Sequence, residues 1–366
     1  MPDRKRGLAA DSDTLRAYDS STVPMSRGKP GSPVTLLDIA NDLGLSRATV
    51  SLVLRNSPRI SEATRERVLE AFKRKGYVYN RHAAGMRSNQ TNTVGVVVND
   101  LANPYFTMLV RSIEASLSTQ GFMTLLGNTD ESLERQSRFL DTVRQHNIDG
   151  LIVCPTESTT AAQMRQVLAW GIPCVFASRY VAGLQTDYVG ADNRRGMALA
   201  TSHLISLGHK RIAMIGGVMR ASTGSDRAEG YRDALRDAKI KLDERLLVPS
   251  PLTRHDGKRI ITELLALKNP PTAVVCGNDI VAFGVMLGLR AHGIEPGADF
   301  GVVGFDDVPE AELWEPPLTT VQVLQDDIGR AAADLLLKRM TEPSRTPTRI
   351  VSEPVLVIRG TCGARK

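Results

Sequence analysis

The spacing of apolar and polar residues divides the chain into three regions. Residues 1–33 show neither a helical nor a strand period and are rich in Ser, Asp, Pro, Gly and Arg, which predicts a disordered arm. Residues 34–79 carry apolar positions at helical spacing. From Thr93 onwards, short apolar runs alternate with amphipathic stretches, so residues 92–366 are expected to form a separate body.

The second region predicts helices, although one stretch is ambiguous. Residues 36–43 place apolar side chains at i, i+3, i+4 and i+7, and a glycine follows them. The next stretch, S-R-A-T-V-S-L-V-L at 46–54, is rich in β-branched residues and favours a strand by local propensity. As a helix, however, it gathers Val50, Val53 and Leu54 on one face. Because only two residues separate the helices, the region predicts a tight helix-turn-helix, and a third helix follows.

The third region predicts parallel α/β layers, because its apolar runs are continuous and helices separate them. The expected strands are Val94–Val98, Phe122–Leu126, Gly150–Cys154, Asp187–Gly190, Arg211–Gly216, Thr272–Cys276 and Phe300–Gly304. The expected helices are, approximately, Pro104–Gln120, Ser132–His146, Thr160–Trp170, Asn193–Leu207, Ser225–Ala238, Asp256–Leu267 and Asp279–His292. The fold class is therefore α + α/β, with a helix-turn-helix head and two similar α/β layers that enclose a ligand cleft.

Composition excludes several classes of protein. The apolar content of 42% and charged content of 23% are those of an ordinary soluble protein, and no apolar run reaches the length of a membrane span. No secretory signal follows the N-terminus, which favours a cytoplasmic location. The four cysteines lack C-x-x-C spacing, so we expect neither a metal site nor a disulfide. Nucleotide-binding and hydrolase motifs are also missing, so we expect no cofactor and no enzyme activity.

Charge is unevenly distributed. The net charge is +6, but residues 1–90 hold 16 Lys and Arg against 9 Asp and Glu, so the first quarter of the chain carries a net +7. The remaining residues are close to neutral. This asymmetry favours a polyanion-binding head on a neutral body, although a basic tail that is merely solvated would give the same count.

Motifs along nearly the whole chain recur in one family of proteins. They are T-L-L-D-I-A-N-D-L-G-L-S-R-A-T-V-S-L-V-L-R-N (35–56), S-E-A-T-R-E-R (61–67), N-P-Y-F (103–106), D-G-L-I (149–152), G-H-K-R-I (208–212), R-A-E-G-Y (227–231), P-T-A-V-V-C-G-N-D (271–279), V-G-F-D-D (303–307) and P-L-T-T (317–320). With them the chain resembles the LacI/GalR family of bacterial transcription regulators.

The resemblance implies how the head would bind double-stranded operator DNA. The second helix would enter the major groove and place Arg47, Ala48 and Leu52 at base-reading positions. Polar residues around it would contact phosphates, or would act only as local helix caps; they are Thr35, Ser46, Thr49, Ser51, Arg55 and Asn56. Residues 80–91 would form a hinge helix that inserts Met86 into the minor groove, with Arg87 at the backbone.

The resemblance also implies a body built like periplasmic sugar-binding proteins, with two Rossmann-like lobes that close on an effector. The first lobe would span about 92–191 and 323–347, and the second about 193–319 and 350–362. The candidate effector contacts are Asn103, Phe106, Asp192, Arg227, Leu252, Asn278, Asp279 and Asp306. For Phe106 the alternative is core packing, and for Asp306 it is the capping of a turn.

Residues and resemblance together predict a cytoplasmic, nucleoid-associated bacterial regulator, most simply a repressor, that responds to a sugar-like effector. Two half-sites imply a homodimer, with interface faces near Pro104–Ser118 and Asp279–Arg290. The alternative for the body alone is a solute-binding receptor for a transporter. Specific binding to the upstream DNA would separate the two functions.

Overall fold

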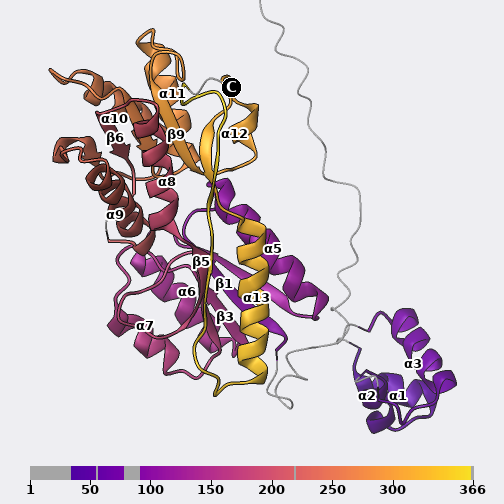
Figure 1. Ribbon diagram of the computed structural model, residues 1–366. Coiled ribbons are helices and arrows are strands. Elements are labelled where there is room, and N and C mark those ends of the chain that lie inside the picture. Colours follow the sequence, from indigo (N-terminus) through magenta and orange to yellow (C-terminus); the bar gives the residue numbers. More distant parts are fainter. Residues whose placement is uncertain (1–33, 55–56, 78–90, 218–219, 364–366) are drawn as a thin grey trace, which may run out of the picture. The chain divides into compact units, whose positions relative to one another are not determined.

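The computed structural model describes residues 34–54, 57–77, 91–217 and 220–363. Two units divide the chain, one within residues 1–81 and the other within 82–366 (Figure 1). We call them the head and the body. The predicted arm (1–33) and nearly all of the predicted hinge (80–91) lie outside the described residues.

The head consists of three helices, α1 (Leu36–Leu43), α2 (Arg47–Leu54) and α3 (Glu62–Lys75). Thr35 begins α1 with a capping box: its hydroxyl accepts from the Asp38 amide, and the Asp38 carboxylate accepts from the Thr35 amide at 2.8 Å. Gly44 ends α1 in the left-handed conformation at φ 64°, where a side chain would be strained. Because α2 spans Arg47–Leu54, the helical prediction for the ambiguous stretch at 46–54 is confirmed.

Packing explains why helix prevails over strand in α2. Val50 and Val53 are buried and join Ile39 of α1 and Val68 and Phe72 of α3 in one apolar core. A strand would place these two valines on opposite faces, because side chains alternate along a strand at odd spacings. The tertiary contacts therefore override the β propensity of the stretch.

The first lobe of the body is built on a parallel sheet in the order β11-β5-β4-β3-β1-β2. Its strands are β1 (Thr93–Val98), β2 (Met123–Asn128), β3 (Gly150–Val153), β4 (Cys174–Ala177), β5 (Asp187–Ala191) and β11 (Arg349–Ser352). Its helices are α5 (Pro104–Thr119), α6 (Leu133–Gln145), α7 (Ala161–Leu168) and α13 (Gln325–Thr341), and α5 lies beside α13.

The second lobe has a sheet in the order β12-β10-β9-β8-β6-β7, parallel except for the pair β10 and β12. Its strands are β6 (Ile212–Ile215), β7 (Leu247–Val248), β8 (Ala273–Cys276), β9 (Gly301–Asp306), β10 (Thr319–Gln322) and β12 (Val355–Val357). Its helices are α8 (Asn193–Ser206), α9 (Ser222–Asp237), α10 (Arg254–Leu265), α11 (Asp279–Ala291), α12 (Glu310–Leu313) and a 3-10 turn at Glu244–Leu246. The α + α/β prediction is confirmed.

The chain crosses between the lobes three times: after β5, between β10 and α13, and between β11 and β12 (Figure 1). The second and third crossings lie a few residues later than the predicted ranges placed them. Residues 320–322 pair within the second sheet, and residues 350–352 pair with β5 in the first. Continuous pairing of β11 along β5 fixes this boundary.

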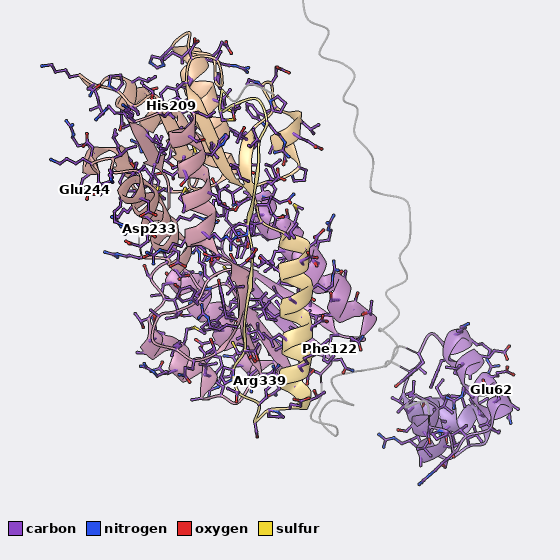
Figure 2. All side chains as sticks on the ribbon, in the orientation of Figure 1. Glu62, Phe122, His209, Asp233, Glu244 and Arg339 are labelled. Atoms are coloured by element: carbon purple, nitrogen blue, oxygen red, sulfur yellow. The ribbon has the colours of Figure 1, made fainter. Side chains whose placement is uncertain are left out.

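A buried ion pair fixes α13 against the first sheet. Arg339, labelled in Figure 2, donates to Asp187 of β5 at 2.7 Å, and the Asp187 carboxylate also accepts from the Thr348 amide. Asp187 is almost fully buried, so these partners are needed to stabilise its charge. In the described part of the chain, no helix is long and apolar enough to cross a membrane, and no three potential metal ligands cluster.

Candidate functional site

In the head, α2 exposes the side chains that would read bases. Val50 and Val53 face the core, whereas Arg47 and Ala48, at the N-terminal end of the helix, are exposed. Leu52 is half-buried. If this end of the helix enters a major groove, the Arg47 guanidinium suits a guanine edge and the Ala48 methyl group suits the methyl group of a neighbouring thymine.

The predicted phosphate contacts already serve as local caps. The Ser46 hydroxyl accepts from the Thr49 amide at 3.0 Å and lies 2.9 Å from the Thr49 hydroxyl. Thr35 caps α1 as described, and Ser51 is half-buried. Capping does not prevent a phosphate contact, because Thr35 and Ser46 remain exposed. The remaining candidates Arg55, Asn56, Met86 and Arg87 lie outside the described residues.

In the body, Arg227 lies at the centre of a buried polar cluster. Its Nε donates to Asn193 at 2.8 Å, one Nη donates to the Gly277 carbonyl, and the other lies 3.5 Å from Asp306. The guanidinium also stacks on the Phe305 ring at 3.7 Å. Burial lowers the pKa of Arg227, while the nearby Asp306 carboxylate raises it. The cluster holds a cation and an anion where little water can reach them.

Asp306 is the incompletely paired member of this cluster. Burial raises its pKa to about 7, and Arg227 offsets only part of that effect. Its backbone has a φ of 114°, a conformation that side-chain-bearing residues rarely adopt, so β9 ends in local strain. Tyr105 of the first lobe lies close enough for Asp306 to raise its pKa, although burial is the larger cause. A buried carboxylate beside a guanidinium can hold the hydroxyl groups of a polar ligand.

The other predicted effector contacts cap helices, lie in the core or pack against glycines. Asn103, Asp192 and Asn278 each cap a helix through their side-chain oxygens, at α5, α8 and α11. Of these three residues, Asn278 alone has a buried side-chain atom, Nδ2, without a hydrogen-bond partner among the described residues, which leaves it a donor for a ligand. Phe106 is buried in the core of the body, and its contact with an effector stays a prediction. Leu252 is half-buried against the glycines at 216 and 277.

Asp279 already has two hydrogen-bond partners within the second lobe. It is fully buried, and its two carboxylate oxygens accept from the Thr320 hydroxyl at 2.5 Å and from the Val308 amide at 2.9 Å. Its pKa is raised well above the usual value, chiefly by burial. These two bonds tie Asp279 to β10 and to the segment after β9, and its role as an effector contact stays a prediction.

A cavity of about 320 Å³ lies between the lobes. The loops that follow β3 and β4 line one side of it, and the start of α9 lines the other. Its polar lining comprises Thr156, Glu157, Thr159, Arg179, Tyr180, Arg220, Ser222, Ser225 and Asp226. Asp226 precedes Arg227 in α9, so the cavity adjoins the buried cluster along the chain. Hydroxyl groups and charged groups of both signs make this a site for a polar ligand.

Sequence reasoning missed the cavity residues from the first lobe. Arg179 and Tyr180 follow β4, a strand that the apolar alternation did not assign. The signal was present, because the apolar run Cys174–Ala177 has the length of a buried strand and a proline precedes it. Since ligand groups in such folds follow the carboxyl ends of strands, assigning β4 would have pointed to Arg179 and Tyr180.

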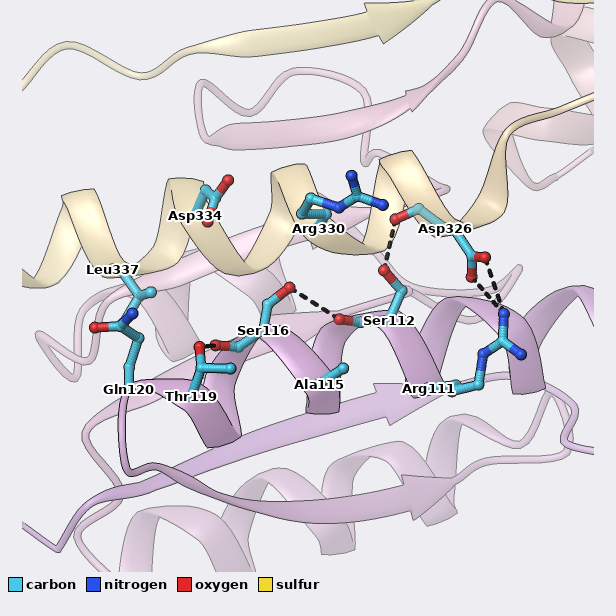
Figure 3. A pocket seen from close by; sticks show the side chains of 10 residues that line it. All are labelled: Arg111, Ser112, Ala115, Ser116, Thr119, Gln120, Asp326, Arg330, Asp334 and Leu337. Atoms are coloured by element: carbon cyan, nitrogen blue, oxygen red, sulfur yellow. Dashed lines mark hydrogen bonds and ion pairs between the residues drawn. The ribbon is translucent and has the colours of Figure 1, made fainter.

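A second groove, between α5 and α13, is less suited to a ligand (Figure 3). Arg111 pairs with Asp326 at 2.9 Å across its end. The hydroxyls of Ser112, Ser116 and Thr119 already donate to backbone carbonyls, as the dashed lines in Figure 3 show. The groove therefore offers few free donors.

Two family models match the chain. One, described as bacterial regulatory proteins of the lacI family, matches residues 35–80. The other, described as periplasmic binding proteins and sugar binding domain of the LacI family, matches residues 91–358. Together they cover the three-helix head and both lobes of the body.

Individual proteins agree with the family models. The ribose operon repressor of Escherichia coli (strain K12) is 32% identical over 326 residues, covering 89% of this chain and 99% of that protein. A transcriptional regulator CelR–cellobiose complex is 34% identical, with a TM-score of 0.69, covering 90% and 99%. The lac repressor dimer bound to operator and an anti-inducer is 25% identical, with a TM-score of 0.82, covering 90% and 99%. The chain belongs to the LacI family of bacterial regulatory proteins.

Proposed function

We propose that this regulator is a transcription repressor that binds operator DNA sequence-specifically as a homodimer. A sugar-like effector held between the two lobes would set its affinity for DNA. The chain would act in the cytoplasm, at the nucleoid, and would have no enzyme activity of its own. The ribose operon repressor and the operator-bound lac repressor dimer support the repressing role and the dimer.

One observation carries the DNA-binding part of the proposal. The end of α2 that exposes Arg47 and Ala48 is the end at which recognition helices of helix-turn-helix proteins contact bases. The valines on the opposite face are committed to the head core. Arg47, Ala48 and Leu52 would read base edges, and the exposed Thr35 and Ser46 would add phosphate contacts to their capping bonds.

The buried cluster and the neighbouring cavity support the effector part. Arg227 of α9 offers a cation, and Asp306 and Asn278, at the ends of β9 and β8, offer an anion and an unused amide donor. A ligand with several hydroxyl groups can satisfy all three. The relative in complex with cellobiose supports a saccharide as the ligand class.

The test uses the full-length protein and DNA from upstream of its own gene. Fluorescence anisotropy at fixed salt would measure binding to that DNA and to a shuffled sequence of equal length. The comparison is needed because contacts to phosphates give any DNA a salt-dependent affinity that carries no sequence specificity. We expect the native sequence to bind at least about a thousandfold more tightly. D-ribose, D-glucose and cellobiose would then be added to find which changes the affinity. Equal binding to the two sequences would favour a solute receptor and refute the proposal.

A further inference from the structure

Hydrogen bonds join the two lobes at the cavity between them. The Tyr180 hydroxyl, from the loop after β4, donates to Asp226 of α9 at 3.0 and 3.1 Å from its two carboxylate oxygens. The Tyr180 backbone amide donates to the Ser222 hydroxyl at 3.0 Å. Tyr180 belongs to the first lobe, whereas Ser222 and Asp226 belong to the second. All three residues line the cavity.

Tyr180 is held firmly on the first lobe. Its ring meets the edge of the Tyr188 ring at 5.5 Å between centroids. The Arg349 guanidinium of β11 lies over both rings, at 4.7 Å from Tyr180 and 4.6 Å from Tyr188. This stack leaves the Tyr180 hydroxyl directed at the second lobe, so any relative movement of the lobes must change its contact with Asp226.

The surroundings of Asp226 partly destabilise the charged form of its carboxylate. Burial raises its pKa, and Asp192 adds repulsion, while the Tyr180 hydroxyl, Arg349 and Arg227 stabilise the charge. The Tyr180 hydroxyl therefore stabilises the charged Asp226 carboxylate when the cavity holds no other hydrogen-bond donor to that carboxylate. A ligand with hydroxyl groups would offer such a donor.

The charges around the cavity favour an uncharged ligand. Both Nη atoms of the buried Arg179 are bound to the Glu131 carboxylate, at 3.0 and 2.8 Å, and one also donates to the Pro155 carbonyl. This guanidinium is thus already neutralised, and the other charged groups of the lining are two carboxylates, Glu157 and Asp226, against one cation, Arg220. A phosphate or a sugar acid would meet these carboxylates, whereas a neutral polyol would donate to them.

We propose that Tyr180, Ser222 and Asp226 form a latch between the lobes, and that an uncharged polyhydroxylated effector releases it by replacing the Tyr180 hydroxyl on Asp226. The proposal rests on the proposed function, since it takes the effector to bind between the lobes. It adds residues that bind or respond to the effector, and it restricts the effector to neutral polyols.

The latch is tested first without any ligand. Hydrogen exchange would be followed in peptides covering residues 178–184 and 220–228 of the full-length protein. Tyr180→Phe removes only the hydroxyl, and we expect exchange there to accelerate about tenfold, as the loss of a hydrogen bond to a charged group predicts. Tyr188→Phe is the matched control and is compared in the peptides covering residues 220–228, because the Tyr188 hydroxyl donates to the Ser178 carbonyl within the first lobe. If both variants exchange alike, the latch does not exist.

The ligand class is tested by calorimetry with D-ribose, D-glucose and cellobiose, each beside an anionic counterpart: ribose 5-phosphate, glucuronate and cellobionate. We expect a neutral sugar to bind and its anionic counterpart to bind at least about tenfold more weakly. Asp226→Ala should weaken that binding about tenfold, whereas Tyr180→Phe should tighten it several-fold, because the sugar no longer competes with the phenol.

Several outcomes would overturn the proposal. They are weaker sugar binding by Tyr180→Phe, tighter binding of an anionic counterpart, or no binding of any neutral sugar. Operator binding measured without sugars separates these failures from a failure of the proposed function. A wild-type protein that selects its own upstream DNA but binds no neutral sugar would remain a DNA-binding regulator without this latch mechanism.

Discussion

Arg47 illustrates how little of a DNA-reading surface is committed to the fold. Its side chain is exposed at the start of α2, and the core behind it is made by Val50 and Val53. Of the three proposed base contacts, Arg47 alone can hydrogen-bond, since Ala48 and Leu52 offer only apolar contacts. Base selection should therefore depend on this residue more than on any other in the described head.

Replacing Arg47 with alanine should relax specificity without unfolding the head. Loss of a bidentate contact to guanine costs about 1–3 kcal/mol, so the preference at one base pair per half-site should disappear. Selection of binding sites from a randomised DNA pool would measure this. Lys73→Ala, which removes one exposed positive charge from α3, is the control and should leave the selected sequence unchanged. An unchanged selection profile for Arg47→Ala would disprove the assignment.

Asp306 makes the stability of the body depend on pH. Its pKa is raised to about 7 in the folded chain, whereas the unfolded value is 3.8. The folded state thus holds this proton more tightly, and stability falls as pH rises from about 4 to about 7 and then levels off. The Asp306→Asn variant does not lose stability in this way, because an amide does not titrate. Its melting temperature relative to the wild type should therefore increase between pH 5 and pH 8.

Thermal unfolding of both proteins at several pH values would check this difference. Titrating groups far from Asp306 contribute equally to the two proteins, so the difference reports on Asp306 together with the neighbour whose pKa it raises, Asp279. The same variant should also weaken effector binding above pH 7, where the wild-type carboxylate is charged and can accept hydroxyl groups. A difference in melting temperature that is constant from pH 5 to pH 8 would show that the Asp306 carboxyl is not perturbed.

At the scale of elements, glycines allow two pairs of helices to approach closely. In the pair α10 and α11, a Cβ at Gly284 would overlap the Arg254 carbonyl oxygen, and one at Gly257 would overlap the Val281 carbonyl oxygen. In the pair α8 and α9, a Cβ at Gly230 would overlap the Arg194 carbonyl oxygen. The helices of the second lobe are thus packed backbone to backbone, and this packing positions α9 and its cavity residues.

Gly284→Ala should destabilise the body, although helix propensity alone predicts the opposite. In an exposed helix this change would stabilise by about 1 kcal/mol. Here the new methyl group must push α10 and α11 apart, at a cost of about 1–3 kcal/mol typical of overpacking. Urea unfolding would measure the sign. Ser118→Ala, at an exposed position of α5, is the control for a change to alanine in a helix. Stabilisation by Gly284→Ala would mean that the close approach is absent.

The elements themselves could largely be predicted from the sequence, because continuous apolar runs and amphipathic helices carry strong periods. Short length alone does not explain the failures, because the predicted strands β3, β6 and β8 are four residues long, as is β4. The apolar run of β4 carries the same signal as those three strands, whereas β7, β10, β11 and β12 have two to four residues and are placed by pairing in the sheet. In the site, Arg227 lies inside a predicted helix and Asp306 lies just after a predicted strand, whereas Tyr180 follows a strand that was not assigned.

At the scale of the whole molecule, the exposed apolar residues indicate where a homodimer interface would lie. Helix α11, expected to offer one face, is mostly buried against its own lobe, and Leu287 is its one exposed large apolar residue. The first lobe offers a clearer surface at β2, the edge strand beside β1. Met123 and Leu126, on opposite faces of β2, are 60% and 40% exposed, and an edge strand with apolar side chains invites association. We therefore expect the homodimer to bury this strand.

Substituting both residues, as Met123→Glu with Leu126→Glu, should separate the dimer, because burying two carboxylates per subunit without partners is unfavourable. Light scattering after size exclusion should then give the mass of a single 39.8 kDa chain, and operator affinity should fall because only one half-site is bound at a time. Leu207→Glu, at a position 38% exposed at the end of α8, is the control for a new charge on an apolar surface position. It should remain dimeric. A double variant that still elutes as a dimer would place the interface elsewhere on the body, and the reduced operator affinity would then not be expected either.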